Sequence, residues 1–556
     1  LYRLDATGPA EFRLPRHEPE LKLFSSRLGG IWLVARSRLW RATDDGAGFR
    51  EIRHLPETLR ALYLQAALED AQGALWFGTR SRGLHRLSGD DIAQIATSSD
   101  DIAGLAQDGD GSIWVATDGG GLNRLRRQAY QLFDRERGLM DNYSYTVAAD
   151  ARGDLWLANR DGGVARVHNG QIDPIARRAG WPAFSARSVH PAPDGSLWIT
   201  SGLGVFRTDA NDFDQLRRVP ELAQLREVRS TFVARNGDYW FALDQERVGR
   251  WRDGELVVFD RERGFEARDI RAFAEDADGR IWIGAGNGAL FRTGDDGHAL
   301  ERVHFPDDFD SGPIQVIRFE PDGRVLLGTT RRGVLMFPPG SFATLRALDR
   351  DHGLVNSNVS QILVDDSDRY WFATRGGIFW AHGEQVRALG AGHADYVHTV
   401  MVGKDDGVPP LSCLGIYQPA AWKAPDGSLW FATRRGVLRA DPAIVAQGRD
   451  TVPSVQLASL SFDDRPQPLT ASAVVPPGTR KIQLRLAALE LATPESLLLR
   501  VRLEGFDEDW SVLGPDRTLT YPSLPSGRYV LAVRISNGAA RWHLQPALFT
   551  LIVPTP

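Results

Sequence analysis

The stretch that decides the fold is Asp110-Gly111-Ser112-Ile113-Trp114-Val115-Ala116-Thr117, because the chain repeats it at a nearly fixed interval. Close copies occupy 194–200, 278–284 and 426–433. Successive anchors lie 44, 38, 42, 42, 42, 42, 44, 45 and 59 residues apart, and they are Trp32, Trp76, Trp114, Trp156, Trp198, Trp240, Trp282, Leu326, Trp371 and Trp430. A second motif, Phe133-Asp-Arg-Glu-Arg-Gly-Leu139, recurs 126 residues later as 259–265, which is three periods of 42. Self-similarity at such a period indicates a repeat architecture.

Each repeat has the pattern of four short strands. An alternating run such as 360–365 predicts a half-buried strand, and the Asp-Gly pair supplies a tight hairpin turn. The apolar run around the Trp predicts a strand that is buried on both faces. A Gly-Leu-x-Arg-like segment forms a third strand, and a short aromatic segment such as Tyr130–Phe133 forms a fourth. Four strands in roughly 40 to 45 residues is typical of a β-propeller blade.

The repeated Trp side chains are interpreted as packing residues, because one blade must stack on its neighbours and a large ring fills the gap between them. Trp181, Trp380 and Trp422 lie outside this register. They are better candidates than the repeated Trp residues for exposed stacking on a ligand, although core packing is the favoured interpretation for each of them too.

The number of repeats predicts two rings. Ten anchors and a partial unit at Leu1–Leu4 exceed the roughly four to eight blades of one propeller. Counting back seven anchors from Trp430 reaches Trp156, so we expect a seven-bladed propeller over 129–448. Residues 1–128 then supply the last blades of an incomplete first propeller, whose missing part is expected before Leu1. The long last period predicts an insertion near 384–416.

The C-terminal segment, 449–556, has a different pattern. Short alternating strands are expected over 455–462, 481–489, 498–503, 528–536 and 547–553. About 100 residues of this kind predict an immunoglobulin-like β-sandwich. The expected fold class is therefore all-β: tandem β-propellers, the first incomplete and the second seven-bladed, followed by this sandwich.

The composition excludes several classes of protein. The 556 residues are 25% charged and 42% hydrophobic with a net charge of −5, which is typical of a globular chain and gives no basic footprint for nucleic acid. Cys413 is the only cysteine, so no intrachain disulfide can form. No run approaches the roughly 18 apolar residues of a membrane span.

Two parts of the sequence resemble known modules. Residues 502–510, 520–529 and 533–538 resemble the Y_Y_Y domain, although Val501 stands where the first of its three tyrosines is expected. The Asp-Gly-x-Leu-Trp-x-x-Thr units resemble two-component-regulator propeller repeats, and Tyr417–Ala420 is similar to the terminal blade of such sensors. The resemblance implies the periplasmic sensor part of a bacterial inner-membrane receptor, a hybrid sensor kinase or diguanylate cyclase. It also implies a homodimer through the sandwich and a membrane tether after Pro556.

The sequence offers little catalytic chemistry. It has no His-Glu-x-x-His, no paired Cys motif, no phosphate-binding Gly-Lys-Ser/Thr loop and no Gly-x-Ser-x-Gly elbow. His393 and His398 are interpreted as surface residues, and Gly119–Gly121 as a blade turn. We therefore expect no catalytic residue, no metal site and no cofactor, while a calcium role for the Asp-Gly turns stays open.

A ligand site is expected at one mouth of the ring. Residues just after the Trp strands, together with residues just before the first strands, converge on one face of a propeller. These residues are Arg80, Arg160, Arg331, Arg332, Arg375, Arg434, Arg435, Asn142, Tyr143, Asn356 and Asn358. Arg presents a planar fork to carboxylates, so the expected ligand is a carbohydrate or an acidic sugar.

The leading hypothesis is an extracytoplasmic ligand-sensing region that passes its signal through the sandwich to a cytoplasmic output domain. A propeller enzyme, such as a lyase or a lactonase with a metal in its central channel, is one alternative. A protein-binding scaffold is the other. The enzyme needs a His/Asp/Glu cluster on the innermost strands, which the sequence does not reveal.

Overall fold

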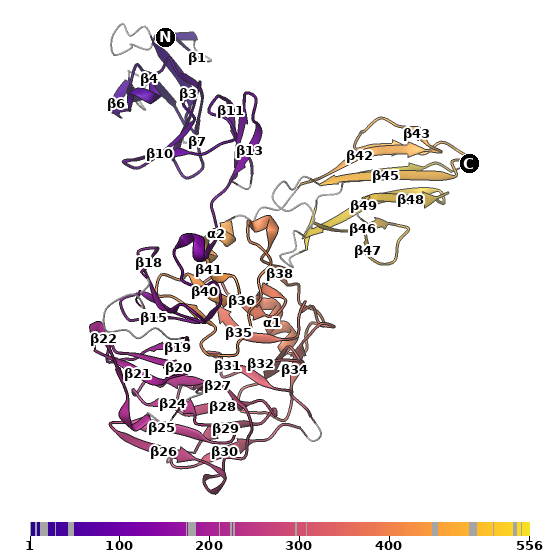
Figure 1. Cartoon of the computed structure of the whole chain (residues 1–556). Helices are drawn as coiled ribbons and strands as arrows, with labels where there is room; N and C mark the ends of the chain where they lie inside the picture. The colour runs from indigo at the N-terminus through magenta and orange to yellow at the C-terminus, as the bar shows by residue number, and fades with distance from the viewer. Residues whose placement is uncertain are drawn as a thin grey trace. The chain divides into compact units, whose positions relative to one another are not determined.

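The chain divides into two compact units, Leu1–Gln128 and Ala129–Pro556 (Figure 1). The structure is a computed structural model that describes residues 2–5, 8–11, 20–27, 29–42, 49–109, 111–173, 175, 185–210, 212–222, 225, 228, 230–294, 297–306, 309–447, 454–488, 497–514, 516–536, 542–545 and 548–555. The partial unit at Leu1–Leu4 lies partly outside these residues, and Trp181 lies wholly outside them.

The first unit is an incomplete propeller. Its described residues form two four-stranded antiparallel blades, a three-stranded sheet and a two-stranded sheet. The blades are β3 (Leu21–Ser25), β4 (Ile31–Ala35), β5 (Arg38–Ala42) and β6 (Phe49–His54), then β7 (Leu64–Glu69), β8 (Leu75–Thr79), β9 (Leu84–Ser88) and β10 (Asp91–Ile95). The three-stranded sheet is β11 (Ile102–Gln107), β12 (Ile113–Thr117) and β13 (Gly121–Leu125), and the two-stranded sheet is β1 (Tyr2–Asp5) and β2 (Gly8–Glu11).

The second unit contains a complete ring of seven four-stranded blades, as predicted. The first three are β15 (Ser144–Ala149), β16 (Leu155–Asn159), β17 (Gly163–His168) and β18 (Gln171–Asp173); β19 (Ala186–Pro191), β20 (Leu197–Ser201), β21 (Gly204–Asp209) and β22 (Asp212–Arg218); β23 (Thr231–Val233), β24 (Tyr239–Ala242), β25 (Val248–Arg252) and β26 (Glu255–Phe259). The next three are β27 (Ile270–Glu275), β28 (Ile281–Ala285), β29 (Leu290–Thr293) and β30 (Leu300–Val303); β31 (Ile314–Phe319), β32 (Val325–Thr329), β33 (Val334–Phe337) and β34 (Arg346–Leu348); β35 (Val359–Val364), β36 (Arg369–Thr374), β37 (Gly377–His382) and β38 (Val400–Met401).

The seventh blade closes the ring with a strand from its beginning. It consists of β39 (Ala421–Lys423), β40 (Leu429–Thr433), β41 (Gly436–Ala440) and β14 (Tyr130–Phe133). β14 pairs antiparallel with β41. The aromatic segment that follows the Trp114 repeat is therefore a fourth blade strand, but of the Trp430 blade. This explains why the sheet of β12 has only three strands.

The region of the expected insertion contains the helix α1 (Gly383–Gly390), which lies between β37 and β38. Its apolar side chains Val386 and Leu389 are buried. A second helix, α2 (Pro442–Gln447), follows the last blade strand.

A repeated aspartate explains why the Trp strand and its turn fold in the same way in successive blades. Asp150 accepts hydrogen bonds from the backbone N–H groups of Arg152 and Asp154 and from Trp156 Nε1, at 2.9, 3.0 and 2.9 Å. The Asp six residues before the Trp does the same in other blades: Trp76 with Asp70, Trp114 with Asp108, Trp282 with Asp276 and Trp371 with Asp365. One carboxylate thus fixes the hairpin turn and accepts the hydrogen bond of Nε1, the only polar atom of the Trp side chain.

The repeated Trp side chains of the propeller are core residues, as expected. Trp156, Trp198, Trp240 and Trp371 are at most 2% exposed. Trp380 is only 1% exposed and packs 6.2 Å from the Trp371 ring, so it is also a packing residue and cannot stack on a ligand at the surface. Trp422 is half-buried against the first blade.

The C-terminal domain is a two-layered sandwich. One sheet has the order β43-β42-β45-β48, and the other has the order β44-β51-β49-β46-β47, with β50 beside β49. The long strands enclose one apolar core that includes Val501, Tyr521 and Tyr529. The strands are β42 (Val455–Phe462), β43 (Arg465–Pro466), β44 (Ser472–Val474), β45 (Lys481–Ala488), β46 (Leu498–Glu504), β47 (Ser511–Val512), β48 (Thr518–Pro522), β49 (Gly527–Ser536), β50 (His543–Leu544) and β51 (Phe549–Val553).

Candidate functional site

Among the described residues, the innermost strand of five ring blades begins with a β-bulge at the same position. The ladder skips one residue between Ser144 and Thr146 in the first blade. The residues at this position in the five blades are Tyr145, Arg187, Arg271, Gln315 and Ser360. A bulge redirects a side chain that would otherwise join the ladder, and such irregularities recur near functional sites. Three of the five contact one segment of chain at the centre of the ring.

That segment is Leu414–Pro419, which we call the floor segment. Gln418 Nε2 donates to the carbonyl oxygen of Gln315 at 2.9 Å, and the Pro419 carbonyl accepts from Val147 N–H at 3.0 Å. Gly415 lies so close to Ser360 that an added Cβ would stand 2.3 Å from the Ser360 Cβ. The floor segment is therefore held by the inner strands of the first, fifth and sixth blades.

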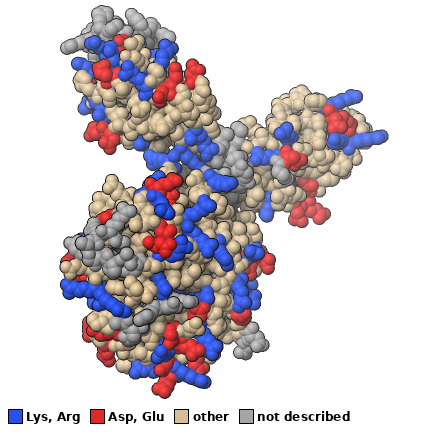
Figure 2. Space-filling view, in the orientation of Figure 1, with Lys and Arg blue, Asp and Glu red and all other residues tan. Residues whose placement is uncertain are grey.

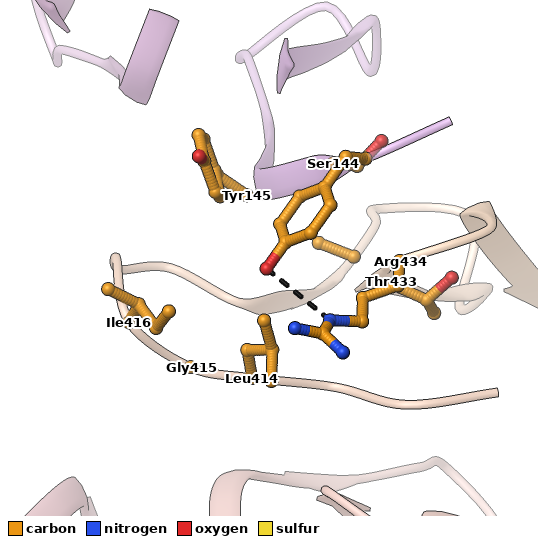
Figure 3. Close-up of a pocket in the computed structure, with 9 residues that line it drawn as sticks. Ser144, Tyr145, Leu414, Gly415, Ile416, Thr433 and Arg434 are labelled. Atoms are coloured by element: carbon orange, nitrogen blue, oxygen red, sulfur yellow. Dashed lines mark hydrogen bonds between the residues drawn. The ribbon is translucent and has the colours of Figure 1, made fainter. Parts of the chain in front are cut away.

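A shallow pocket opens beside the floor segment. Its enclosed space is about 10 Å³, room for about one water molecule, and nine residues line it. Tyr143, Ser144 and Tyr145 come from the start of β15, Leu414, Gly415 and Ile416 from the floor segment, and Ala432, Thr433 and Arg434 from the end of β40. In Figure 3 the Arg434 guanidinium lies beside the segment of Leu414 and Gly415.

Three tyrosines and two arginines surround the pocket. The rings of Tyr143 and Tyr145 lie 5.2 Å apart, and those of Tyr145 and Tyr417 lie 4.7 Å apart, both edge to face. Arg434 Nε donates to the Tyr143 hydroxyl at 3.4 Å, the bond drawn in Figure 3. The guanidinium carbons of Arg160 and Arg434 lie 4.8 and 5.5 Å from the centre of the Tyr143 ring. Such cation–π contacts hold the aromatic and cationic groups in one arrangement.

The phenol of Tyr145 stays protonated at neutral pH. Burial raises its pKa above the ordinary value, and the neighbouring Tyr417 and Tyr143 raise it further, while the charges of Arg160 and Arg187 oppose the shift. Tyr145 therefore offers a hydroxyl donor next to two cationic side chains. This chemistry suits the binding of an oxygen-rich or anionic group.

The structure brings together three of the eleven residues proposed from the sequence: Tyr143, Arg160 and Arg434. Arg80 belongs to the first unit and does not share this ring. Arg331 pairs with Asp310 at 3.4 Å, and Arg332 lies 5.9 Å from the Phe309 ring. Arg80, Arg331 and Arg332 thus lie in other surroundings and do not line this pocket.

The other five proposed residues have local roles or exposed side chains. Asn142 Oδ1 accepts from the Arg135 N–H at 2.7 Å, and Asn356 Oδ1 accepts from the Asn358 N–H at 2.9 Å. Asn142, Asn356 and Asn358 therefore shape the segments that enter the blades. Arg375 and Arg435 are exposed at the turns that follow β36 and β40.

Sequence reasoning missed Ser144, Tyr145, Arg187, Tyr417 and the floor segment. The motif 417–420 was visible in the sequence, but nothing local showed that it enters the ring. The bulge that places Tyr145 has no residue signature either, because the skipped position holds Tyr, Arg, Gln or Ser in different blades.

Within the described ranges, no group of three or more His, Cys, Asp or Glu side chains is placed to hold a metal ion. No helix in the part of the chain that the structure covers is long and apolar enough to cross a membrane. On the face shown in Figure 2, acidic and basic side chains are interspersed.

The comparisons with known proteins agree on the fold. Residues 490–553 match the Y_Y_Y domain, and residues 264–287 match the two component regulator propeller. No curated protein matches the chain.

Several solved structures resemble the chain, one of them with a TM-score above 0.5. The extracellular domain of BT3049 from B. thetaiotaomicron, described as a hybrid two component system, superposes with a TM-score of 0.69 at 17% identity, over 99% of this chain and 74% of that one. The extracellular domain of BT4673 from the same organism gives 0.44 at 14%, over 100% and 78%. Virginiamycin B lyase from Staphylococcus aureus gives 0.41 at 14%, over 56% of this chain and 98% of its own.

Proposed function

We propose that this chain, which combines two component regulator propeller repeats with a Y_Y_Y domain, is the extracytoplasmic ligand-sensing region of a bacterial transmembrane receptor. The pocket beside the floor segment binds the ligand. The sandwich passes the binding signal to a cytoplasmic output domain, a histidine kinase or a diguanylate cyclase. The BT3049 domain, whose fold is the same, is described as extracellular, and this supports a periplasmic location.

The observation that carries the proposal is the composition of the pocket. Its polar side chains are tyrosines, hydroxyl residues and an arginine, all of which donate hydrogen bonds at neutral pH. None of the nine lining residues is an Asp, Glu or His, the usual proton-transfer groups of an enzyme. A site of donors and aromatic faces is suited to binding a polyhydroxylated or acidic ligand.

The experiment is a calorimetric titration of the chain with neutral and acidic saccharides. Arg434→Ala should weaken any interaction at least about 10-fold, since a hydrogen bond to a charged group contributes about 1.5–3 kcal/mol. Arg152→Ala is the matched control, because Arg152 is an exposed arginine in the β15–β16 hairpin, at the opposite end of these strands. Equal affinities in the two variants would remove the pocket from the proposal.

The membrane tether is proposed to follow Pro556. Sequencing the gene beyond this codon should reveal an apolar segment of about 20 residues and then a signalling domain. A stop codon directly after Pro556 would contradict the receptor assignment and leave the binding pocket intact.

We also propose that the receptor pairs as a homodimer through the sandwich. Val512 on β47 and Leu544 on β50 are 65% and 63% exposed, and both strands flank the sheet of β46 and β49. Sedimentation velocity should detect a dimer that Val512→Glu weakens, because a charge in an apolar interface loses its hydration. Val355→Glu on the ring, where Val355 is 56% exposed, is the control. A chain that stays monomeric with bound ligand would refute pairing through this domain.

A further inference from the structure

The outer face of one sandwich sheet carries two arginines directly opposite each other. In the ladder between β46 and β49, Arg500 pairs with Arg534, and both strands turn their alternate, apolar residues into the core (Figure 1). The same row continues to Val512 on β47 and to Leu544 on β50, so the two charges lie between two exposed aliphatic side chains. Like charges at directly opposite positions destabilise an antiparallel pair. A bound anion would remove this repulsion.

No acidic side chain in the described part of the sandwich neutralises the pair. The neighbouring Arg502 has an ion-pair partner, Glu504 at 3.0 Å, whereas Arg500 and Arg534 have none among the described residues. Arg500 Nε is buried and donates no hydrogen bond, so a ligand can reach this guanidinium only at its two terminal amino groups. These two groups form the end of the planar fork that arginine presents to an anion.

Two indole rings hold the guanidinium groups in place. The guanidinium carbon of Arg500 lies 4.6 Å from the centre of the Trp542 ring. Arg534 and Arg502 share the Trp510 ring, at 4.3 and 5.1 Å. An indole attracts the flat face of a guanidinium, whereas the N–H donors point outward in its plane and remain available. A fork that is held in this way loses less conformational entropy when it binds a ligand.

The number of cations in the row decides the class of anion. A carboxylate has one charge and two oxygens, which match a single guanidinium fork. A phosphoryl group carries about −1.5 to −2 charges at neutral pH and three strong acceptor oxygens. Two guanidinium groups opposite each other, with that of Arg502 beside them, therefore match a phosphoryl group better than a carboxylate.

We infer that this row is a phosphoryl-binding site, in which Arg500 and Arg534 hold the anion between Val512 and Leu544. The inference goes beyond the proposed ligand sensing, because the site lies on the sandwich and shares no residue with the pocket of the ring. The phosphoryl group belongs either to free phosphate or to the headgroup of a lipid such as phosphatidate. Two chains that pair through this sheet would bring more arginines to the row, so a bound anion is compatible with the proposed homodimer.

The direct test is a calorimetric titration of the chain with inorganic phosphate at neutral pH. Arg534→Gln and Arg500→Gln should each weaken binding about 10-fold or more, because each removes hydrogen bonds to a charged group. Arg485→Gln is the matched control, because Arg485 is an exposed arginine on β45 in the other sheet of the sandwich. Equal phosphate affinities in Arg485→Gln and in the other two variants would overturn the site.

Two further measurements separate a phosphoryl site from general screening and from loss of fold. Acetate at the same ionic strength should bind at least about 10-fold more weakly than phosphate, and equal binding of the two anions would overturn the choice of a phosphoryl group. Phosphate should raise the melting temperature of the unchanged chain and leave that of Arg534→Gln unchanged, because only a ligand bound to the folded state stabilises it. An equal increase in both proteins would contradict the site.

Vesicles of phosphatidylcholine with and without phosphatidate separate the two sources of the phosphoryl group. Co-sedimentation with the phosphatidate vesicles that is lost in Arg534→Gln supports a lipid headgroup. Binding of inorganic phosphate without co-sedimentation supports free phosphate, and the absence of both refutes the site.

The ring pocket is tested separately with Arg434→Ala. Phosphate binding that Arg434→Ala abolishes and Arg534→Gln preserves would place the anion in the ring pocket. That result would support the proposed function and overturn the present inference. Phosphate binding that depends on Arg534 alone supports the sandwich site, whatever ligand the pocket binds.

Discussion

Acidification should destabilise the ring through one buried histidine, His190 on β19. This side chain is 7% exposed, and its Nε2 lies 2.6 Å from the Thr231 hydroxyl. Burial lowers the pKa of His190 to about 4, against a smaller opposing effect of its hydrogen bond with the backbone of Gln418. The folded ring therefore holds His190 in the neutral form at pH values where the unfolded chain binds a proton.

The direction and the size of the change in stability follow from this difference in the pKa of His190 between the folded and the unfolded chain. Above about pH 6.5 both states are neutral and the histidine has no effect on stability. Between about 6.5 and 4 the unfolded state gains a proton that the folded state excludes, so stability falls as the pH falls. A drop to pH 5 spans about 1.5 units, which corresponds to about 2 kcal/mol. For a domain of this size, that is a decrease of about 4 °C in the melting temperature.

The assay is differential scanning calorimetry at pH 7 and pH 5 on the chain and on His190→Gln. The glutamine variant should show a smaller decrease between the two pH values, because glutamine does not titrate. Other groups titrate equally in both proteins and cancel in this comparison. His304→Gln, which replaces an exposed ring histidine, should behave as the unchanged chain does. An identical pH dependence in the chain and in His190→Gln would refute the reasoning.

Three further substitutions test the packing that supports the site, each by its melting transition. Asp365→Ala should lower the free energy of unfolding by about 3 kcal/mol, because it removes hydrogen bonds to two backbone N–H groups and to the buried Trp371 Nε1. A loss below about 1 kcal/mol would contradict that role of Asp365. Gly415→Ala should lower the free energy of unfolding by about 2–4 kcal/mol, because the added Cβ clashes with Ser360 and the backbone has a positive φ. The same substitution should weaken ligand binding, and unchanged binding would mean that the floor segment is not rigid. Tyr529→Phe should lower the free energy of unfolding of the sandwich by about 1 kcal/mol, since the Tyr529 hydroxyl donates to a backbone carbonyl at 2.8 Å. A change in the melting transition of the propeller ring would contradict this local role.

Local periodicity made the architecture predictable. A blade is defined by residues close in sequence, such as Asp150 and Trp156, so the Trp register fixed the number of blades and the seven-bladed ring. The alternation in 455–462 likewise predicted β42 because one face of that strand is buried. These features repeat because each blade meets the same packing requirement.

The pocket was less predictable, because its residues do not repeat. Arg434 and Tyr143 were proposed separately from the geometry of blades, but their contact joins positions 291 residues apart. Tyr145 and Tyr417 meet only because the bulge redirects one and the floor segment carries the other to the ring centre. No period or motif encodes such a pairing.

The sequence by itself determined that this chain forms blades of four strands around buried Trp side chains and ends in a sandwich. Only the tertiary structure decided which blades become neighbours at the seam of the ring. There β14 pairs with β41, and so the start of the ring lies beside its last blade. The pocket sits at this seam because ring closure, a single long-range event, brings β15 and β40 together.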